Sequence, residues 1–321
     1  MEIAHSLAEV CVDISQGTCV TWGNFDGVHL GHQKLLTHLC RKASAFGLKS
    51  VLITFSPHPL HVLGSAPSII TCLHTRLELI AKLGVDLTLV LPFTMELASL
   101  EPEDFVHKMF ASGLQTKQVV LGYSSFFGKG RRGSASLLSL MGKDLGFEVE
   151  QLSPVLLNGA VVSSTRVRRH IAAGDMPGVT ALLGRKHIVG GVVRVGRKMG
   201  QKLGFPTLNI HPPEDMNFLG LGYDALCGML PAQGVYAVWA EHKGEFFRAV
   251  ASVGTNPTFE SSLGSLPIGL EVHILDFSKD LYGEFVRIHF VDRLRGQQCF
   301  ASPEELKIQI RKDIEKTKKI V

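Results

Sequence analysis

The arrangement of apolar segments changes near residue 183, and this change limits the possible fold more than any other feature of the chain. Before it, apolar, β-branched runs such as residues 49–55 alternate with segments of helical spacing such as residues 30–47. This alternation predicts a parallel sheet with helices on both faces. In such sheets ligands bind beyond the carboxyl ends of the strands. We therefore expect a site in the loops that follow the strands.

After Leu183 short strand-like runs follow one another, at residues 187–195, 234–241, 244–253, 268–277 and 283–292. No helical segment of convincing length separates them, which predicts an antiparallel barrel or sandwich. Near the end of the chain, Ser302, Pro303 and Glu305 match the start of a capped helix. The chain is thus expected to be an α/β domain followed by a β domain that ends in a helix.

The composition indicates a soluble globular protein. Of the 321 residues, 45% are hydrophobic and 19% are charged, which is a typical balance for this class. No apolar window is long enough to cross a bilayer, and the N-terminal segment lacks the pattern of a secretory signal. The six cysteines are scattered, with no CxxC pair, as expected of free thiols in a reducing compartment. We therefore expect a cytoplasmic protein with no membrane partner.

Basic residues concentrate between Ser163 and Leu203, a stretch whose single acid is Asp175. They are Arg166, Arg168, Arg169, Arg185, Lys186, Arg194, Arg197, Lys198 and Lys202. Such a block suits an anionic partner, which could be a nucleic acid, a nucleotide or a phosphorylated small molecule, and a solvated basic face is equally consistent with it. No RNA-binding motif is present, and aromatic residues are not interleaved with the basic ones. We therefore expect no nucleic-acid partner.

The segment GNFDGVHLGH connects a short apolar run, CVTW, to a segment of helical spacing. Gly23 and Gly27 permit close backbone approach, and Asp26 suits an Asx turn. His29 and His32 fall at the start of the helix, one turn apart on the same side. Helix N-termini attract anions, so these imidazoles are candidates for binding a polyphosphate and stabilising charge during its transfer. A pair of surface or metal-binding histidines is the alternative.

A second glycine-rich segment, GRKMGQKLGFPTLNI, begins at Gly196. Together with Gly200 and Gly204 it forms a flexible loop whose N–H groups could wrap phosphates, although most such loops are ordinary turns. Thr207 and Asn209 are two apart on the following strand and present oxygen atoms to the same side. Hard oxygen ligands together with nucleotide phosphates usually hold Mg²⁺. Thr207 and Asn209 are therefore candidate Mg²⁺ ligands.

The segment IGLEVHILDF contains a candidate general base. Its apolar residues Ile268, Leu270, Val272 and Ile274 alternate to one face of a strand, and Glu271 points to the other. A carboxylate in this position could accept a proton during catalysis. It could equally be an ordinary side chain on the solvated side of the strand, and the periodicity leaves both readings open.

In the first half, GNFDGVHLGH resembles the HxGH signature of nucleotidylyltransferases, in the variant found in prokaryotic bifunctional riboflavin kinase/FAD synthetases. The segments TFSPHP and SSTRVRRHIAAGD resemble two further segments of that family. The resemblance implies catalytic roles for His29 and His32, and nucleotide or phosphate contacts from Gly23, Asn24, Phe25, Asp26, Ser164, Thr165 and Arg168. It implies flavin contacts from His58, Pro59, Ser124 and Phe127.

The loop GYSSFFG departs from the GxDFxFG pattern of that family. Ser124 stands where an acid or amide is usual, and Ser125 stands where the family has a phenylalanine. These changes remove a hydrogen-bond partner and a packing surface for a ring, which could weaken FMN recognition or adenylylation. The HxGH and SSTxxR motifs are intact, so a working site is expected.

In the second half, GFPTLN resembles the riboflavin kinase signature, in which the threonine and asparagine bind Mg²⁺ and ATP. This implies those roles for Thr207 and Asn209, with phosphate contacts from the glycine-rich loop. The glutamate of LEVH takes the proton from the flavin ribityl hydroxyl in that family, which implies this role for Glu271. The segment DRLRGQQCF resembles one that lies against the isoalloxazine, which implies a flavin contact from Arg295.

The resemblance extends over nearly the whole chain. It implies a nucleotidylyltransferase-type parallel α/β sheet in residues 1–182, and a six-stranded antiparallel barrel with a terminal helix in residues 183–321. The implied activity is phosphorylation of riboflavin to FMN, then adenylylation of FMN to FAD with release of pyrophosphate. The implied cofactor is Mg²⁺ and the partners are riboflavin, FMN, FAD and ATP; an oligomer is possible but not indicated.

Two alternatives remain at this point. The first is a monofunctional riboflavin kinase whose first half serves as a scaffold or flavin-binding module. The second is a nucleic-acid-binding protein that uses the basic block. Formation of FAD from supplied FMN would distinguish the first, and steep salt dependence of RNA binding would indicate the second.

Overall fold

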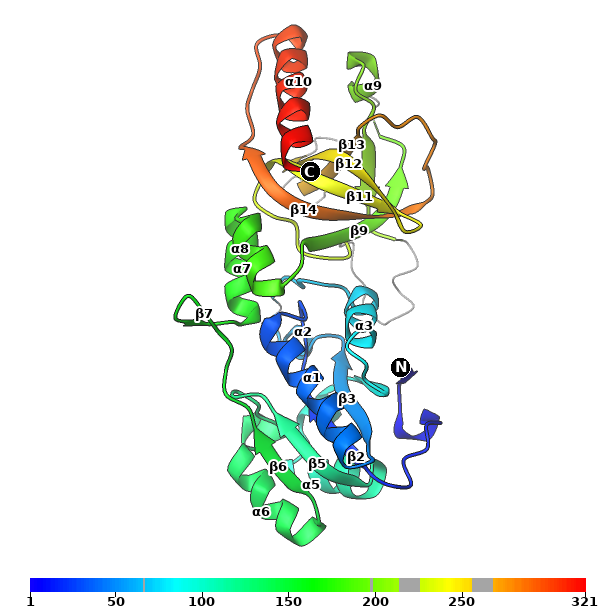
Figure 1. Cartoon of the computed structure of the whole chain (residues 1–321), viewed down its shortest axis with the longest axis vertical. Coiled ribbons are helices and arrows are strands. Elements are labelled where there is room, and N and C mark those ends of the chain that lie inside the picture. The colour runs from blue at the N-terminus through cyan, green and yellow to red at the C-terminus, as the bar shows by residue number, and fades with distance from the viewer. Residues whose placement is uncertain (66, 197–198, 214–225, 256–267) are drawn as a thin grey trace. The chain divides into compact units, whose positions relative to one another are not determined.

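The computed structural model describes residues 1–65, 67–196, 199–213, 226–255 and 268–321 (Figure 1). Arg197 and Lys198 of the basic block lie outside these residues. The chain divides into two compact units. The first contains Met1–Pro67 and Cys72–Ser163, and the second contains Ser68–Thr71 together with the described chain from Ser164 to Val321.

A six-stranded sheet forms the centre of the first unit. Its strand order is β1-β4-β3-β2-β5-β6, and every neighbouring pair is parallel. The strands are β1 (Glu2–Ala4), β2 (Thr18–Trp22), β3 (Lys49–Ser56), β4 (Leu87–Pro92), β5 (Thr116–Leu121) and β6 (Glu148–Gln151). The helices are α1 (Leu30–Ala45), α2 (Pro59–Val62), α3 (Leu73–Ala81), α4 (Met95–Ala98), α5 (Pro102–Val106), a π-helical segment (His107–Gly113) and α6 (Ala135–Leu145). A small hairpin of β7 (Leu156–Leu157) and β8 (Ala160–Val161) follows.

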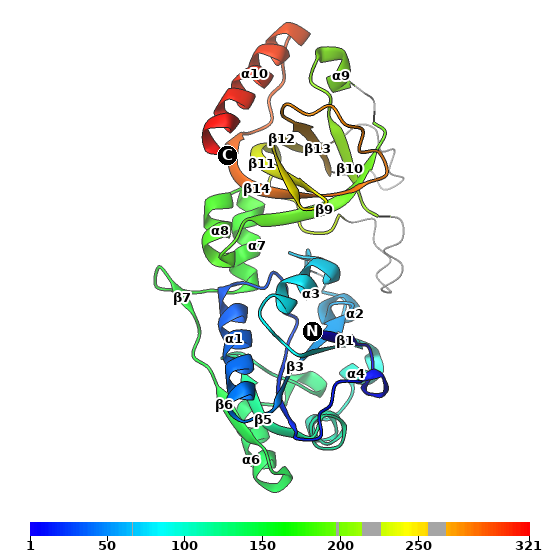
Figure 2. The ribbon, with the colours of Figure 1, turned by 45° about the vertical axis from the view of Figure 1, so that its right-hand side comes forward.

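Apolar side chains cover both faces of this sheet, and Figure 2 shows helices on either side of it. On one face, strand residues such as Val20 and Ile53 pack with Phe110 of the π-helical segment. On the other face, the alternate strand positions pack with Leu36 and Leu39 of α1. The two sets separate because successive side chains of a strand point to opposite faces. The predicted parallel sheet with helices on both faces is confirmed.

The second unit is built on a closed barrel, with the strand order β10-β13-β12-β11-β14-β9 and β9 pairing with β10. Every neighbouring pair is antiparallel. The strands are β9 (His187–Arg194), β10 (Leu208–His211), β11 (Gly234–His242), β12 (Glu245–Thr255), β13 (Ile268–Ile274) and β14 (Phe285–Arg295). The predicted six-stranded antiparallel barrel is confirmed, and the sandwich is excluded.

The helices of the second unit are α7 (Ser164–Ala173), α8 (Met176–Leu183), α9 (Met199–Leu203) and α10 (Pro303–Ile320). Helix α8 packs on β9 and β14, and α10 packs on β11, β12 and β14. The predicted start of α10 is confirmed, because Ser302 Oγ accepts a hydrogen bond from Glu305 N–H at 3.2 Å. The short helix α9 was not expected; it lies in the glycine-rich segment and ends where Gly204 takes a left-handed conformation (φ 87°).

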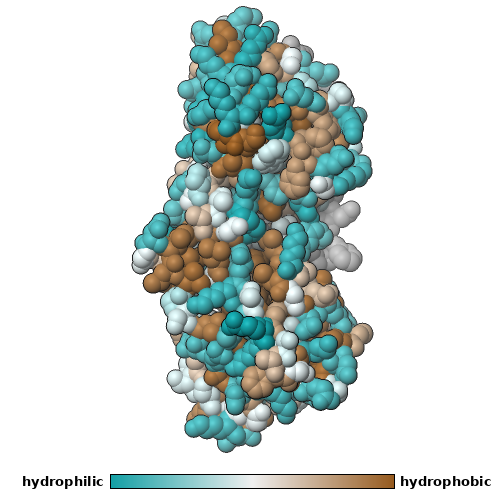
Figure 3. Space-filling model, viewed as in Figure 1, coloured by the Kyte–Doolittle hydropathy of each residue, from teal (hydrophilic) through white to brown (hydrophobic). Residues whose placement is uncertain are grey.

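The surface of the chain is mixed in polarity. Figure 3 shows hydrophilic residues over most of the face in view, with apolar residues among them in small groups. Such a surface is usual for a folded protein. Within the described ranges, no helix has both the length and the apolar character needed to span a membrane.

Candidate active sites

The first candidate site begins where the buried strand β2 ends. The chain leaves the sheet at Gly23 in a tight loop whose backbone is left-handed at Phe25 (φ 50°), Gly27 (φ 86°) and Val28 (φ 41°). Phe25 and Val28 hold these uncommon conformations with their side chains buried in the core. Such backbone strain at non-glycine residues is concentrated at functional sites. The loop lies at the carboxyl end of β2, where parallel sheets bind ligands.

The HxGH motif produces a pair of stacked imidazoles at the start of α1. His29 is the N-cap residue, and its Nδ1 accepts a hydrogen bond from His32 N–H at 3.3 Å. The two rings stack with their centroids 3.6 Å apart. A Cβ atom at Gly31 would lie 3.1 Å from the His29 ring. Glycine at this position therefore allows the close approach of the two histidines.

The environment of His32 favours its neutral form. Burial above all, and then the neighbouring His29 and Arg76, lowers the pKa of His32 well below its ordinary value. His32 is therefore neutral at pH 7. Its Nδ1 is buried and has no hydrogen-bond partner among the described residues. A neutral imidazole at a helix N-terminus can donate a hydrogen bond to an anion.

The motif TFSPHP meets this loop through His58. The ring of His58 is buried, and its Nε2 lies 3.2 Å from the amide nitrogen of Asn24. Its Nδ1 accepts a hydrogen bond from Leu60 N–H at 3.2 Å, at the start of α2. Pro59 is the first residue of that helix. The contact between His58 and Asn24 thus brings the motifs TFSPHP and GNFDGVHLGH together.

Arg76 on α3 is a residue of this site that the sequence analysis missed. It is only 4% exposed. Its Nη1 donates to the carbonyl oxygen of Asn24 at 2.7 Å, and its Nη2 donates to that of Phe55 at 3.2 Å. Burial lowers the pKa of Arg76, and the nearby carboxylate of Asp26 opposes this effect. The guanidinium therefore holds together the segments that follow β2 and end β3.

For the FAD formation that the resemblance implies, we expect Arg76→Met to lower kcat by about tenfold or more. The change removes two hydrogen bonds from a charged group, each worth about 1.5–3 kcal/mol, and so releases the loop at Asn24 from the end of β3. Arg76→Lys should restore part of the rate. Steady-state kinetics would separate kcat from KM, with riboflavin phosphorylation by the same protein as the internal control. Unchanged kcat with a lower midpoint of thermal unfolding would show that Arg76 serves the fold alone.

The loop GYSSFFG follows β5, the neighbour of β2 in the sheet. Phe127 is buried, and its ring packs edge-on against Trp22 at a centroid distance of 5.3 Å. Phe126 is 48% exposed, and the guanidinium of Arg131 lies 5.0 Å from its ring centre. Ser124 is also exposed. Phe127 is thus part of the core, and flavin contacts from Ser124 and Phe127 stay predictions.

The motif SSTRVRRH forms helix α7, which starts at Ser164. Arg168 Nε donates to the carbonyl oxygen of Ser68 at 2.8 Å, a contact inside the second compact unit. His29 and His32 belong to the first unit. A phosphate site shared by α7 and these histidines therefore stays a prediction.

The second candidate site is a row of residues across the barrel. Asn209 on β10 pairs with Glu271 on β13, and Glu271 pairs in turn with Ser252 on β12. Asn209 is buried and Glu271 is partly buried. Leu270 and Val272 are buried, as expected if they face the opposite side of β13. The strand pairing thus places the candidate base directly beside a candidate Mg²⁺ ligand.

The glycine-rich loop packs directly on the candidate Mg²⁺ ligands. A Cβ atom at Gly196 would lie 2.2 Å from Asn209 Nδ2. A Cβ atom at Gly200 would lie 2.3 Å from the carbonyl oxygen of Phe205 and 3.2 Å from Thr207 Oγ1. Glycine at both positions allows the loop backbone to approach these side chains closely.

His273 contributes to the same candidate site, although the sequence analysis assigned it no role. It lies two residues after Glu271 and so on the same face of β13. Its Nδ1 donates to the carbonyl oxygen of Pro206 at 2.7 Å. This contact fixes the backbone immediately before Thr207.

Arg295 is bound to the terminal helix. Its Nε donates to both carboxylate oxygens of Asp313, at 3.2 and 3.0 Å, and its Nη2 donates to Oδ2 at 2.9 Å. Asp313 is only 4% exposed. The pair therefore ties the end of β14 to α10. A flavin contact from Arg295 stays a prediction.

We expect Asp313→Ala to destabilise the barrel strongly, because breaking a buried ion pair costs about 3–5 kcal/mol. Urea unfolding followed by circular dichroism would measure the loss. Glu315→Ala is the matched control, since Glu315 lies on the same helix with a side chain 66% exposed and pairs with Lys318 at the surface. Equal stability of the two variants would show that the Arg295–Asp313 pair does not hold α10.

Comparison with known proteins supports a separate assignment for each half of the chain. The family model for FAD synthetase matches residues 11–166, and that for riboflavin kinase matches residues 183–321. A bifunctional riboflavin kinase/FMN adenylyltransferase from Haemophilus influenzae is 34% identical over 308 residues, which cover 95% of this chain and 94% of that protein. The Escherichia coli K12 protein of the same name is 33% identical over 316 residues, which cover 98% and 96%.

A solved structure also resembles the whole chain. The crystal structure of a Streptococcus pneumoniae protein, described as a macrolide-efflux protein, is 29% identical, with a TM-score of 0.83 and coverage of 98% of both chains. The Haemophilus influenzae and Escherichia coli proteins each align with nearly the whole chain, so each matches both of the segments that the two family models match. The chain therefore belongs to the bifunctional riboflavin kinase/FMN adenylyltransferase family.

Proposed function

We propose that this chain makes FMN and FAD in two successive steps. Residues 183–321 phosphorylate riboflavin with ATP, and residues 1–182 transfer AMP from a second ATP to FMN with release of pyrophosphate. The observation that carries the proposal is the pairing of Asn209 with Glu271 beneath the glycine-rich loop. The stacked His29 and His32 at the start of α1 support the second activity.

In the kinase step, Glu271 accepts the proton of the flavin ribityl hydroxyl. The oxygen then attacks the γ-phosphorus of ATP, the bond to the bridging oxygen breaks, and ADP leaves. The backbone of the loop that contains Gly196 and Gly200 binds the phosphates. Such transfers depend mainly on positioning and on stabilisation of charge, with proton removal adding to both.

We assign Mg²⁺ to the kinase site. Among the described residues, no group of three or more His, Cys, Asp and Glu side chains could hold a metal ion. The candidate oxygen donors are instead Asn209, which pairs with Glu271, and Thr207, two residues before Asn209. Mg²⁺ commonly takes one or two protein ligands and completes its shell with substrate phosphates and water, so this donor set fits the ion. When bound, it would neutralise charge on the phosphates during transfer.

In the adenylylation step, a phosphate oxygen of FMN attacks the α-phosphorus of ATP and pyrophosphate leaves. His29 and His32 donate hydrogen bonds to the oxygens on which charge develops. Ser164, Thr165 and Arg168 of α7 bind the departing phosphates. No residue stands out as a covalent nucleophile, so we propose direct in-line displacement.

We also propose that the chain works in the cytoplasm without a nucleic-acid or membrane partner. None of the six cysteines, all of which lie in the described residues, forms a disulfide, which suits a reducing compartment. The phosphates of ATP and FMN are anionic partners of the kind that the basic block suits. The rival reading as a monofunctional riboflavin kinase is less favoured, because both family models match and the similar proteins carry both activities in their names.

Isotopically labelled ATP tests the two steps separately. With riboflavin, label from the γ-phosphate should enter FMN and FAD, and label from the α-phosphate should enter FAD alone. Transfer of the γ-label without the α-label would establish the monofunctional kinase instead. Absence of γ-label from FMN would overturn the kinase assignment.

A further inference from the structure

A shallow pocket lies on the outer face of the barrel. Its volume is about 280 Å³, and it is lined by Lys186, Trp239, Phe246 and His289. These residues come from β11, β12, β14 and the residue before β9, and all belong to the second compact unit. The pocket is therefore a property of the barrel half alone.

The strand pairing holds the walls of this pocket in place. On β11, Val238 and Ala240 are buried in the barrel, so Trp239 points outward. Trp239 pairs with His289 on β14. The ring of Phe246 packs edge-on against that of His289, with the centroids 5.2 Å apart.

Hydrogen bonding orients the ring of His289. Its Nε2 donates to Glu241 Oε2 at 2.7 Å, and Arg287 pairs with the other oxygen of the same carboxylate at 3.7 Å. The carboxylate is thus already engaged by two partners. It fixes the His289 ring as a wall of the pocket, and Lys186 supplies a positive charge to the lining.

The chemistry of the lining favours a flat aromatic anion. Lys186 Nζ lies 6.0 Å from the centre of the Trp239 ring, at the edge of cation–π range. In the described ranges, Lys186 forms no ion pair with a carboxylate. Phe246 is 54% exposed and presents an apolar ring beside this ammonium. Aromatic faces stack on planar heterocycles, and a lysine at their edge can meet a phosphate.

The closed barrel separates this pocket from the kinase site. In the closed strand order, β12 and β11 separate β13 from β14 in one direction, and β10 and β9 separate them in the other. Glu271 is on β13 and His289 is on β14, so the two side chains belong to opposite sides of the barrel. A ligand in the pocket would not compete with riboflavin or ATP for Glu271.

We propose that this pocket is a second, non-catalytic binding site for a planar aromatic heterocycle that carries phosphate, the chemistry shared by FMN, FAD and adenine nucleotides. The volume is near the lower limit of ordinary small-molecule sites, so it accommodates one ring system with its phosphate directed toward Lys186. The site goes beyond the two proposed reactions and does not depend on them.

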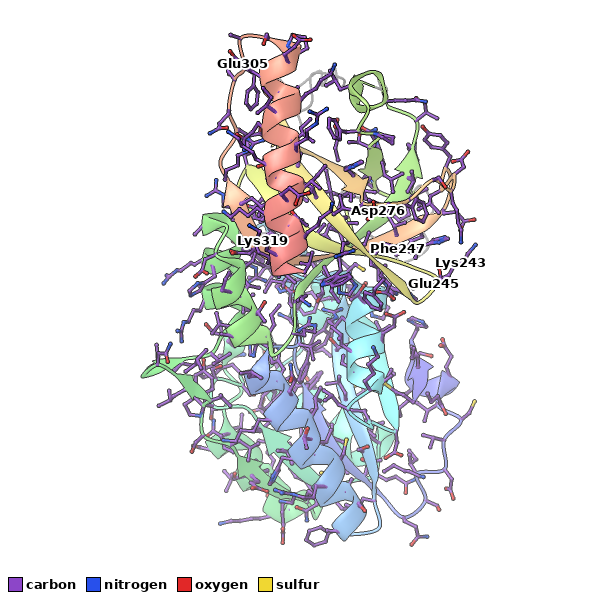
Figure 4. All side chains as sticks on the ribbon, turned by 45° about the horizontal axis from the view of Figure 1, so that its top comes forward. Lys243, Glu245, Phe247, Asp276, Glu305 and Lys319 are labelled. Atoms are coloured by element: carbon purple, nitrogen blue, oxygen red, sulfur yellow. The ribbon has the colours of Figure 1, made fainter. Side chains whose placement is uncertain are left out.

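Calorimetric titration of the full-length chain with FMN, FAD and AMP tests this site. Lys186→Gln removes the charge, and Phe246→Ser removes an exposed ring whose loss should leave the fold intact. Lys243→Gln is the matched control, because Lys243 lies on the β11–β12 turn, as Figure 4 shows, and pairs with Glu284 outside the pocket.

The wild type and Lys243→Gln should bind at least one of the three ligands at the pocket. Lys186→Gln and Phe246→Ser should each lower the affinity of that binding by about tenfold or more. The rates of FMN and FAD formation at saturating substrate should stay unchanged in Phe246→Ser. Preference for FMN over AMP would identify the ring as a flavin, and the reverse would identify an adenine. The same stoichiometry and affinities in all four proteins for all three ligands would overturn the proposal.

Discussion

Glu271→Ala is expected to reduce FMN formation from riboflavin by about 10²–10⁴-fold, the usual contribution of a general base. The variant should still adenylylate supplied FMN at the wild-type rate, because Glu271 lies on β13 of the barrel and the HxGH motif lies in the first compact unit. Chromatographic assay of FMN and FAD, with riboflavin or FMN as the starting flavin, measures both rates in one protein.

Two further variants sharpen this test. Glu271→Gln keeps the shape of the side chain and removes the base, so it should lose nearly as much kinase activity. Glu245→Ala removes an exposed carboxylate from the first residue of β12, labelled in Figure 4, and should leave both rates unchanged. Equal loss of the two activities in Glu271→Ala would show that the halves are misassigned.

His32→Ala is expected to stop the sequence at FMN. Loss of one donor to a developing negative charge lowers a rate by about 10²–10³-fold, so FAD formation should fall by that amount while riboflavin phosphorylation continues. His38→Ala is the control, because His38 lies on the same helix and pairs with Glu150 at 3.0 Å. A His32→Ala protein that forms FAD at the wild-type rate would contradict the assignment of the HxGH motif.

The pH dependence provides a second test of His32. Its pKa is lowered in the folded chain, so the neutral form persists as the pH falls through the ordinary histidine value near 6.5. The stability linked to this group is therefore present above pH 6.5 and is lost only as the pH falls toward the lowered pKa. Between pH 7.5 and 6.5, FAD formation should show no loss of activity from protonation of His32. A titration centred near pH 6.5 that disappears in His32→Gln would contradict this.

The fold could be predicted from the sequence wherever local periodicity determines it. Alternating strand and helix patterns were sufficient for the parallel sheet, and consecutive strands were sufficient for an antiparallel β domain. Periodicity alone left barrel and sandwich open, because the choice depends on the pairing of β9 with β10 and β14, which no local pattern encodes. The family resemblance was what predicted the barrel. Helix α9 was missed because five residues among glycines carry too little periodic signal.

The candidate sites were predictable where the residues form a compact motif. The position of His29 and His32 follows from one stretch of sequence, and so does the strand face that carries Glu271. Arg76 was missed because its partners, the carbonyl oxygens of Asn24 and Phe55, are distant in sequence. The engagement of Arg295 by the terminal helix was hidden for the same reason.

The most direct test of the account is a time course with the purified chain, riboflavin, Mg²⁺ and excess ATP. We predict that FMN appears first, passes through a maximum and declines as FAD accumulates, with one pyrophosphate released for each FAD. Accumulation of FMN to completion without FAD, in a protein that also fails to convert supplied FMN, would contradict the proposed second activity.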